Sequence, residues 1–190
     1  MGSSGDYTAP TLIGGAGDDV LVASSGGSVM TGGGGADSLS GGFNDELHDG
    51  GAPSGDDVFV YNAVSDSTST AYDTVGFFQT TETGGLNFGP SQDVFRLWFA
   101  VTAVDASVTT GTLSTATFDS DLAAAVGPSQ LGVHHAVMFS PNAGSLAGDH
   151  FLVIDANGVA GYQAGADLVI EINGSQVTDP YTFTTANFTT

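Results

Sequence analysis

The segment Gly14–Val22 reads GGAGDDVLV, and Gly32–Ser40, which begins 18 residues later, reads GGGGADSLS. Both match the nine-residue template G-G-x-G-x-D-x-U-x, where U is a large apolar residue. The glycine half of each unit is expected to turn a corner, because glycine adopts backbone angles that other residues avoid. The x-U-x half is expected to form a short strand with its apolar side chain inward. Since such short strands are not stable alone, the units must stack on one another as a parallel β-roll.

Weaker units fill the rest of the stretch up to residue 60. Residues 23–31 (ASSGGSVMT) carry Ser28 at the aspartate position, and residues 41–49 (GGFNDELHD) carry Glu46 there. The unit that starts at Gly50 (GGAPSGDDVFV) contains two extra residues before it regains the pattern. The units that start at Gly14, Gly32 and Gly50 are 18 residues apart, so two units make one coil and these three stack on a single edge. The inward residues are then Leu21, Met30, Leu39 and Phe59.

This edge is the candidate metal site. Stacked glycine corners direct backbone carbonyls into the gaps between coils, and the aspartates of successive corners, Asp19, Asp37 and Asp57, add carboxylates. Hard oxygen ligands in such numbers favour calcium. Three corners enclose two gaps, so we expect about two calcium sites here, and one weak site or none on the opposite edge. The other candidate ligands are Gly14, Ala16, Asp18, Gly32, Gly34, Ala36, Gly50, Ala52 and Asp56.

Composition limits the classes of partner. The 190 residues include 1 lysine or arginine and 21 aspartates or glutamates, which gives a formal net charge of −20 at pH 7. Such a surface repels nucleic acid and anionic membranes, whereas it attracts cations. No segment is apolar enough for a membrane span, no cleavable secretion signal is recognisable, and the lack of cysteine excludes disulfides and thiolate sites. The alternative to a roll is a disordered glycine-rich linker, but the regular phase of the repeats argues against it.

These units resemble the repeats of RTX proteins, which are calcium-dependent substrates of type I secretion. Residues 56–78 (DDVFVYNAVSDSTSTAYDTVGFF) and 92–99 (QDVFRLWF) resemble the stretch that closes the β-roll in the C-terminal domain of serralysin-type proteases, and residues 166–188 resemble the last strands of such domains. The resemblance implies an all-β fold in which a short parallel β-roll continues into a β-sandwich-like C-terminal layer. It also implies calcium as the bound ion, a type I exporter as a partner, and a location outside the cell or on its surface.

The expected organisation has three parts. Residues 1–10 are a leading linker, residues 11–60 the roll, and residues 61–190 a β-rich layer that carries the secretion signal. In that layer, runs of β-branched and aromatic residues predict strands. One helix is predicted over residues 117–126 (TFDSDLAAAV), with Asp119 as its N-terminal cap and Gly-Pro at its end.

Asp155, Asn157 and Asp167 form a second candidate site. Oxygen side chains two residues apart before Gly158, with a carboxylate further on, resemble part of a calcium loop. Loops of this type precede the final strands of many RTX-like tails, including the domain called bluetail. The alternative is an Asn-Gly hairpin turn between two strands, and the sequence does not separate the two.

No catalytic pattern emerges from the polar residues. The histidines do not form the His-Glu-x-x-His zinc motif of proteases, and no G-x-S-x-G elbow is present. Asp179-Pro180 matches the cleavage dipeptide of some RTX self-processing modules, but a turn is its commoner meaning. Arg96 is expected to pair with a carboxylate, and the adjacent pair His134-His135 to lie in a strand with its rings on opposite faces. The remaining histidines are His48 and His150.

Together these features predict a calcium-binding module that is not an enzyme. It is expected to fold when calcium binds outside the cell, as the tail of a type I-secreted or surface protein. Two alternatives remain open. The chain could be a self-associating surface-layer or adhesin module, or the non-catalytic tail of a secreted protease.

Overall fold

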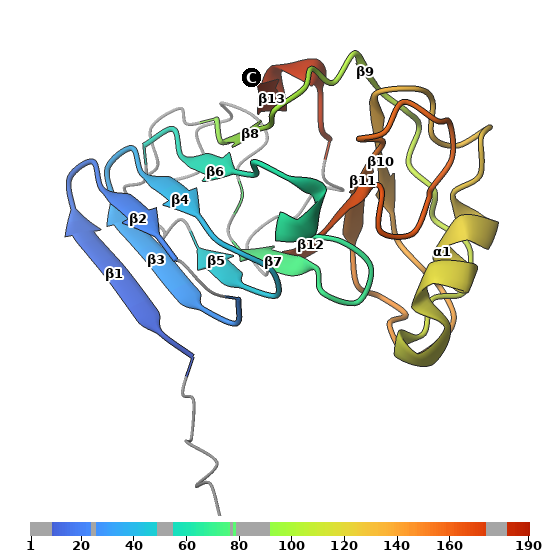
Figure 1. Ribbon diagram of the computed structural model, residues 1–190, viewed down its shortest axis with the longest axis horizontal. Coiled ribbons are helices and arrows are strands. Elements are labelled where there is room, and N and C mark those ends of the chain that lie inside the picture. The colour runs from blue at the N-terminus through green and yellow to red at the C-terminus, as the bar shows by residue number, and fades with distance from the viewer. Residues whose placement is uncertain (1–8, 24–25, 49–54, 77, 79–91, 174–181) are drawn as a thin grey trace, which may run out of the picture.

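The computed structural model describes residues 9–23, 26–48, 55–76, 78, 92–173 and 182–190, which form two β-sheets (Figure 1). Within these residues the long sheet has eight strands, and the short sheet has five. In spatial order, the long sheet consists of β1 (Thr11–Ala16), β3 (Val29–Gly34), β5 (Glu46–His48), β7 (Asp73–Gly76), β12 (Leu168–Asn173), β11 (Phe151–Ile154), β10 (His135–Phe139) and β9 (Ala103–Val104). The short sheet consists of β13 (Phe188–Thr189), β8 (Val94–Arg96), β6 (Val58–Val60), β4 (Ser38–Ser40) and β2 (Val20–Val22).

The chain passes alternately between the two sheets from β1 to β8, which makes a parallel β-roll. In the short sheet Leu21 pairs with Leu39, Leu39 with Phe59, and Phe59 with Phe95. Leu39 and Phe59 are fully buried, as is Met30 from the long sheet, whereas Leu21 is only partly buried because its coil is the last one at that end. The predicted all-β roll is confirmed, and its inward residues are those that the repeat template indicated.

The repeat that begins at Gly41 is one residue shorter than the nine-residue template. Met30 pairs with Leu47, which is 2% exposed, so Leu47 occupies the inward position of this unit, where the nine-residue template counted from Gly41 would put His48. Glu46 opens strand β5 with its side chain exposed, and Asp45 occupies the corner position before it. The assignment of Glu46 to the aspartate position is therefore wrong. The unit has lost one corner residue, and the buried apolar position sets its register.

Parallel stacking continues past residue 60. Strand β7 pairs with β5, and β8 pairs with β6, in the register of the earlier coils. Aromatic rings fill this part of the core, with Phe78 and Phe95 stacked at a centroid distance of 4.5 Å and Phe183 next to both. The C-terminal strand β13 adds to β8 in parallel, so the end of the chain completes the short sheet.

The C-terminal half extends the long sheet and covers its outer face. Strands β12, β11 and β10 are antiparallel to one another, while β12 joins the roll by pairing in parallel with β7. One face of these strands packs on the core of the roll through residues such as Met138 and Leu152, and the other packs through Phe139 and Phe151 on a second core. That second core includes Leu122 of helix α1 (Phe118–Ala125) and gives the region a sandwich-like third layer (Figure 1).

The predicted helix is present, but its cap differs. Helix α1 (Phe118–Ala125) follows a 3-10 turn, η2 (Thr115–Thr117), and its N-cap residue is Thr117. Asp119 lies inside the first turn, where its Oδ1 accepts a hydrogen bond of 2.6 Å from the Tyr162 hydroxyl. The other short helical turns are η1 (Val64–Asp66) and η3 (Thr185–Asn187). None of the helices in the described part of the chain is both long enough and apolar enough to cross a membrane.

Candidate metal centre

The corners on one edge of the roll are joined by their aspartates. The backbone N–H of Asp19 donates to Asp37 Oδ1 (2.9 Å), that of Asp37 donates to Asp57 Oδ1 (2.6 Å), and that of Asp57 donates to Asp93 Oδ1 (3.0 Å). We call Asp19, Asp37, Asp57 and Asp93 the first aspartate ladder. The three aspartates chosen from the sequence thus lie on consecutive coils of one ridge, and a fourth follows them.

Sequence reasoning missed Asp93 because no glycine-rich corner of the template precedes it. The usable signal is the shorter pattern D-x-U, which recurs at the start of each strand of the short sheet from β2 to β8. Asp93 and Phe95 show this pattern, and they stack directly on Asp57 and Phe59.

A second row of carboxylates lies beside this ladder. Asp18 Oδ1 accepts a hydrogen bond from Ala36 N (2.9 Å), and Asp56 Oδ1 accepts one from Gln92 N (2.9 Å). Each bond joins one coil to the next, as in the first ladder. Corners with two consecutive aspartates therefore place one carboxylate inside the ridge and the other at its exposed rim.

One carboxylate oxygen of Asp37 is not used by the ladder. Asp37 is 1% exposed, and its Oδ2 atom is buried without a hydrogen-bond partner among the described residues. A buried carboxylate oxygen without a partner is costly unless a proton or a cation accompanies it. The other oxygen, Oδ1, accepts the N–H of Asp19 from the neighbouring coil. The ladder therefore carries negative charge that, among the described residues, no cationic side chain balances.

Glycine at the first repeat position makes room for the carboxylate of the same unit. A Cβ atom on Gly32 would lie 2.1 Å from Asp37 Oδ2, and one on Gly14 would lie 2.6 Å from Asp19 Oδ2. The corners also touch backbone to backbone, because a Cβ on Gly33 would lie 2.0 Å from the carbonyl oxygen of Gly15. Only glycine permits coils to approach this closely while the carboxylates turn into the ridge.

The carbonyl groups predicted as ligands lie in the same corners. Residues Gly14–Ala16 form the end of β1 and pair with residues 32–34 at the end of β3, so their carbonyls belong to neighbouring coils. The Gly34 carbonyl already accepts a hydrogen bond from Gly17 N at 2.5 Å, and Ala36 donates its N–H to Asp18. Gly50 and Ala52 lie outside the described residues.

The donor set of the first ladder fits calcium in its chemistry. The ridge holds carboxylates and carbonyl oxygens, which are the ligands that calcium takes, and a carboxylate oxygen without a partner points into it. Within the described ranges, no three side chains of histidine, cysteine, aspartate or glutamate converge on one point. An ion on this ridge would therefore take carboxylates from neighbouring coils and complete its shell with carbonyls or water.

The opposite edge of the roll carries a second aspartate ladder. Ser28 N donates to Asp45 Oδ1 (2.6 Å), Asp45 N donates to Asp73 Oδ1 (2.8 Å), and Asp73 N donates to Ser67 Oγ (2.8 Å). Burial and the neighbouring charge of Asp45 raise the pKa of Asp73 to about 8. Asp45 and Asp73 were not among the predicted ligands, although both fit the D-x-U pattern.

The loop after β11 uses its carboxylates to hold its own backbone. Asp155 and Asp167 are both fully buried. Asp155 accepts from the N–H groups of His134 (2.7 Å) and Gly158 (2.9 Å), and Asp167 accepts from Gln163 N (2.7 Å). Burial, together with the nearby Asp155, raises the pKa of Asp167 to about 7.

This geometry bears on both interpretations of the loop. Strand β11 ends at Ile154 and β12 begins at Leu168, so the connection is much longer than a two-residue hairpin, and that alternative is wrong. Asn157 Oδ1 accepts from Val159 N (2.7 Å), which closes a local turn. The structure brings Asp155 and Asp167 together, but with N–H groups aimed at their oxygens. A calcium site at Asp155, Asn157 and Asp167 stays a prediction, and these N–H groups do not favour it.

The remaining basic side chains do not build a shared site. Strand β10 begins at His135, whose Nδ1 lies 3.0 Å from Asp105 Oδ2, while His134 precedes the strand with a φ of 53°. The placement of both histidines in one strand is therefore wrong. His150 Nδ1 lies 2.7 Å from Ser140 Oγ. Arg96 is exposed and, in the part of the chain that the structure describes, forms no ion pair with a carboxylate, contrary to expectation.

Comparison with known proteins agrees with the geometry of the roll. Residues 6–85 match the family model described as Peptidase M10 serralysin C terminal. No curated protein matches the chain. The matched range contains every glycine-rich repeat and both strands of each of the first coils. Over residues 6–85 the chain is therefore similar to the serralysin-type C-terminal family, whose repeats are of the calcium-binding RTX type.

Proposed function

We propose that this chain is a calcium-binding module whose folding is coupled to calcium. The observation that carries the proposal is the first aspartate ladder, in which stacked coils bring buried carboxylates onto one ridge with no basic side chain among them. The family of the repeats, which binds calcium in general, supports the choice of ion. Calcium, when bound, would supply the positive charge that the ridge lacks.

The size of the repulsion explains why folding would need the ion. Neighbouring coils are about 4.8 Å apart, and two unit charges at that distance repel by about 3.5 kcal/mol at an effective dielectric constant of about 20. The ladder contains three such neighbouring contacts. Their sum is of the order of 10 kcal/mol, which is comparable with the whole stability of a domain. A divalent ion bound between the coils would attract the carboxylates on both sides and so offset their mutual repulsion.

The ligands proposed for the ridge come from consecutive corners. Carboxylates are supplied by Asp19, Asp37 and Asp57, and at the rim by Asp18 and Asp56. Asp93 extends the set by one coil, because it accepts from Asp57 N as Asp57 accepts from Asp37 N. The proposed carbonyl ligands are those of Gly14, Ala16, Gly32, Gly34, Ala36, Gly50 and Ala52.

Calcium coupling suggests where the module works. In a compartment with scarce calcium, the ladder carboxylates would keep the roll open, and millimolar calcium outside the cell would close it. We propose that the chain leaves through a type I exporter with an uncleaved C-terminal signal, and that it folds outside the cell or on its surface. It would act without catalysis of its own, as the tail of a secreted or surface protein, including the case of a secreted protease. The proposal of type I export is supported by the family match over residues 6–85 and by the net charge of −20.

Calorimetric titration of the chelator-treated chain with calcium, followed by circular dichroism, tests this proposal. We expect saturable binding at two or more sites per chain and the appearance of a β spectrum only after calcium is added. Magnesium at the same concentration serves as the control, because it demands a tighter octahedral shell. A complete β spectrum in chelator, with the same thermal midpoint as in calcium, would reject the proposal.

Self-association is a second candidate function, and the open end of the roll favours it. Strands β1 and β2 are the outermost strands of the two sheets at this end. They expose Ile13 (71%), Val20 (76%) and Val22 (62%). Edge strands with exposed aliphatic side chains are ready to pair with another chain. Sedimentation in calcium tests this function: dimers that dissociate on the double change Val20→Lys and Val22→Lys would support it, and monomers at all concentrations would exclude it.

A further inference from the structure

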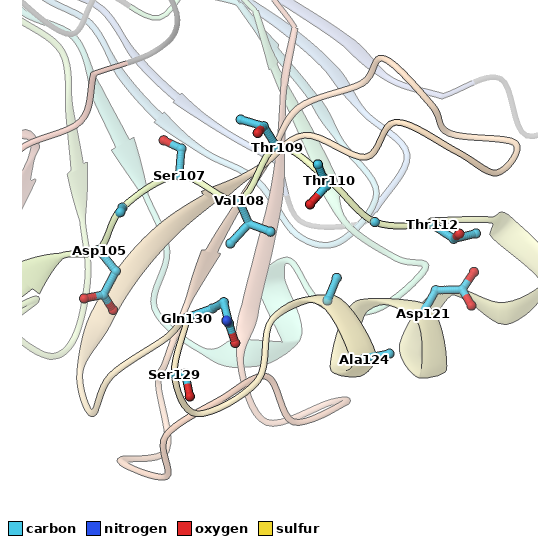
Figure 2. A pocket seen from close by; sticks show the side chains of 13 residues that line it. Asp105, Ser107, Val108, Thr109, Thr110, Thr112, Asp121, Ala124, Ser129 and Gln130 are labelled. Carbon is cyan, nitrogen blue, oxygen red and sulfur yellow. The ribbon is translucent and has the colours of Figure 1, made fainter.

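A groove lies on the far side of the molecule from the roll, between helix α1 and the segment of residues 105–112. Figure 2 shows this segment running across the groove opposite Ala124 and Asp121 of the helix, with Ser129 and Gln130 from the following loop. Its volume is about 980 Å³, which is within the range of ligand-binding clefts. None of the repeats contributes to it, so its function is separate from that of the calcium ridge.

The segment 105–112 is the outer edge of the long sheet. It continues from β9, the last strand of that sheet, and follows β10 through isolated bridges from Val108 to Phe139 and from Thr112 to Ala143. Its N–H groups reach β10 only at intervals, where Asp105 donates to Ala136 O and Val108 donates to Met138 O, both at 2.8 Å. The edge is thus fastened at a few points and follows an irregular path between them.

Between these points the backbone has hydrogen-bonding capacity to spare. In the described part of the chain, no N–H or carbonyl group of Ala106, Ser107, Thr109 or Thr110 bonds to another backbone group. All four residues are exposed. Backbone groups of this kind, along a sheet edge that faces a helix across a groove, are the feature that lets an extended peptide add as a further strand.

The lining decides the chemistry of the occupant. Hydroxyl groups, one side-chain amide and small side chains make up most of the lining, and among the residues that the structure describes no aromatic or basic side chain lines the groove. Hydrogen bonds and charge are then the available means of holding a ligand. Asp105 and Asp121 are fixed at the two ends of the lining: Asp105 is bound to His135 and Gly132 N, and Asp121 is bound to Ser114 N and the Thr117 hydroxyl.

Charge determines which kind of peptide the groove would attract. The chain carries a net charge of −20 at pH 7, and Arg96, which is the single residue among its lysines and arginines, does not line the groove. An anionic ligand would meet two fixed carboxylates and a strongly negative field, whereas a cationic one would be attracted by both. We propose that this groove binds an extended, positively charged peptide segment of a partner protein, which adds to the edge at residues 105–112.

Nuclear magnetic resonance titration of the calcium-loaded full chain tests the proposal. The probe is a short capped peptide of alternating lysine and threonine, and the control is the same peptide with glutamate in place of lysine. We expect saturable shifts of the amides of residues 106–112 and 129–130 with the lysine peptide alone. A neutral oligosaccharide, maltohexaose, is titrated in parallel, and if it shifts these amides while the lysine peptide does not, the proposal is overturned.

Two matched variants separate binding in the groove from general attraction to an acidic protein. Ala124 and Ala123 are neighbours on helix α1 and both are exposed, but only Ala124 lines the groove. Ala124→Trp should fill the groove and weaken the lysine peptide about ten-fold or more, while Ala123→Trp should leave its affinity within about two-fold. Equal affinities for the two variants, or shifts spread over the roll instead of residues 106–112, would overturn the proposal.

Discussion

The exchange Asp37→Asn should have opposite effects on stability with and without calcium. Asp37 lies in the middle of the first aspartate ladder, with Asp19 on one side and Asp57 on the other. Asparagine keeps the shape of the side chain and an oxygen that can accept the N–H of Asp19. It removes one buried negative charge and the Oδ2 atom proposed as a calcium ligand.

The magnitude follows from the spacing of the coils. Two neighbours at about 4.8 Å each contribute about 3.5 kcal/mol of repulsion at an effective dielectric constant of about 20. If N–H dipoles and counter-ions cancel two thirds of this, Asp37→Asn stabilises the calcium-free chain by about 2 kcal/mol. In calcium the same exchange removes a charged ligand, so we expect affinity to fall about ten-fold or more and the calcium-dependent stability to fall with it.

Urea unfolding in saturating calcium measures the second effect. Because the calcium-free chain is expected to lack β structure, the first effect is measured in chelator by folding with the osmolyte trimethylamine N-oxide. A gain of about 2 kcal/mol should lower the osmolyte concentration at which half of the calcium-free chain is folded. Asp149→Asn removes the same unit of charge outside the roll and serves as the control. If Asp37→Asn destabilises the chain in chelator as much as in calcium, the ladder is held by its hydrogen bonds and the electrostatic reasoning is refuted.

Three further outcomes follow from the packing and the buried carboxylates. Gly32→Ala should displace the carboxylate of Asp37 and weaken calcium binding in a calorimetric titration, whereas Gly127→Ala, where a Cβ has its nearest neighbour at 3.4 Å, should not. Because the pKa of Asp167 is raised to about 7, the folded chain holds a proton that the unfolded chain releases above its ordinary pKa near 4. Stability should therefore fall between pH 5 and 8 by about 2 kcal/mol through this group, and Asp167→Asn should flatten the profile of the urea midpoint against pH. Phe95→Ala should cost about 3–5 kcal/mol in calcium; a loss below about 1 kcal/mol would mean that the aromatic core of the roll is loosely packed.

The repeats could be interpreted from the sequence because local and long-range requirements coincide there. Each glycine-rich corner is also the place where backbones of neighbouring coils touch, so the pattern that turns the chain also sets the spacing of Asp19 and Asp37. The corner at Asp45 shows the limit of this reasoning. Counting nine residues placed Glu46 at the aspartate position, whereas burial of Leu47 determined the register and shortened the unit by one residue.

Loops and long separations account for most of what the sequence did not reveal. Asp73 and Asp93 join their ladders after insertions between coils, and the distances in sequence to Asp45 and Asp57 are 28 and 36 residues. A template with a fixed period does not identify Asp73 and Asp93. They can be identified from what each coil of the roll requires. Every strand that adds to the roll needs an inward apolar residue and, two positions earlier, an acceptor for the corner N–H of the coil before it. A search for that pair without the glycines finds both residues.

The same requirement explains why the ladders are made of aspartate. Asparagine or serine could accept the corner N–H, as Ser67 does for Asp73 at the end of the second ladder. Hydrogen bonding alone therefore does not select a charged residue at Asp19, Asp37, Asp57 and Asp93, and repulsion between coils selects against one. A stack of carboxylates at positions where a neutral acceptor would hold the backbone equally well is explained by a cation that the neutral residue would bind less tightly. If Asn at these positions left calcium affinity unchanged, that explanation would fail, and the ladders would have to be regarded as structural.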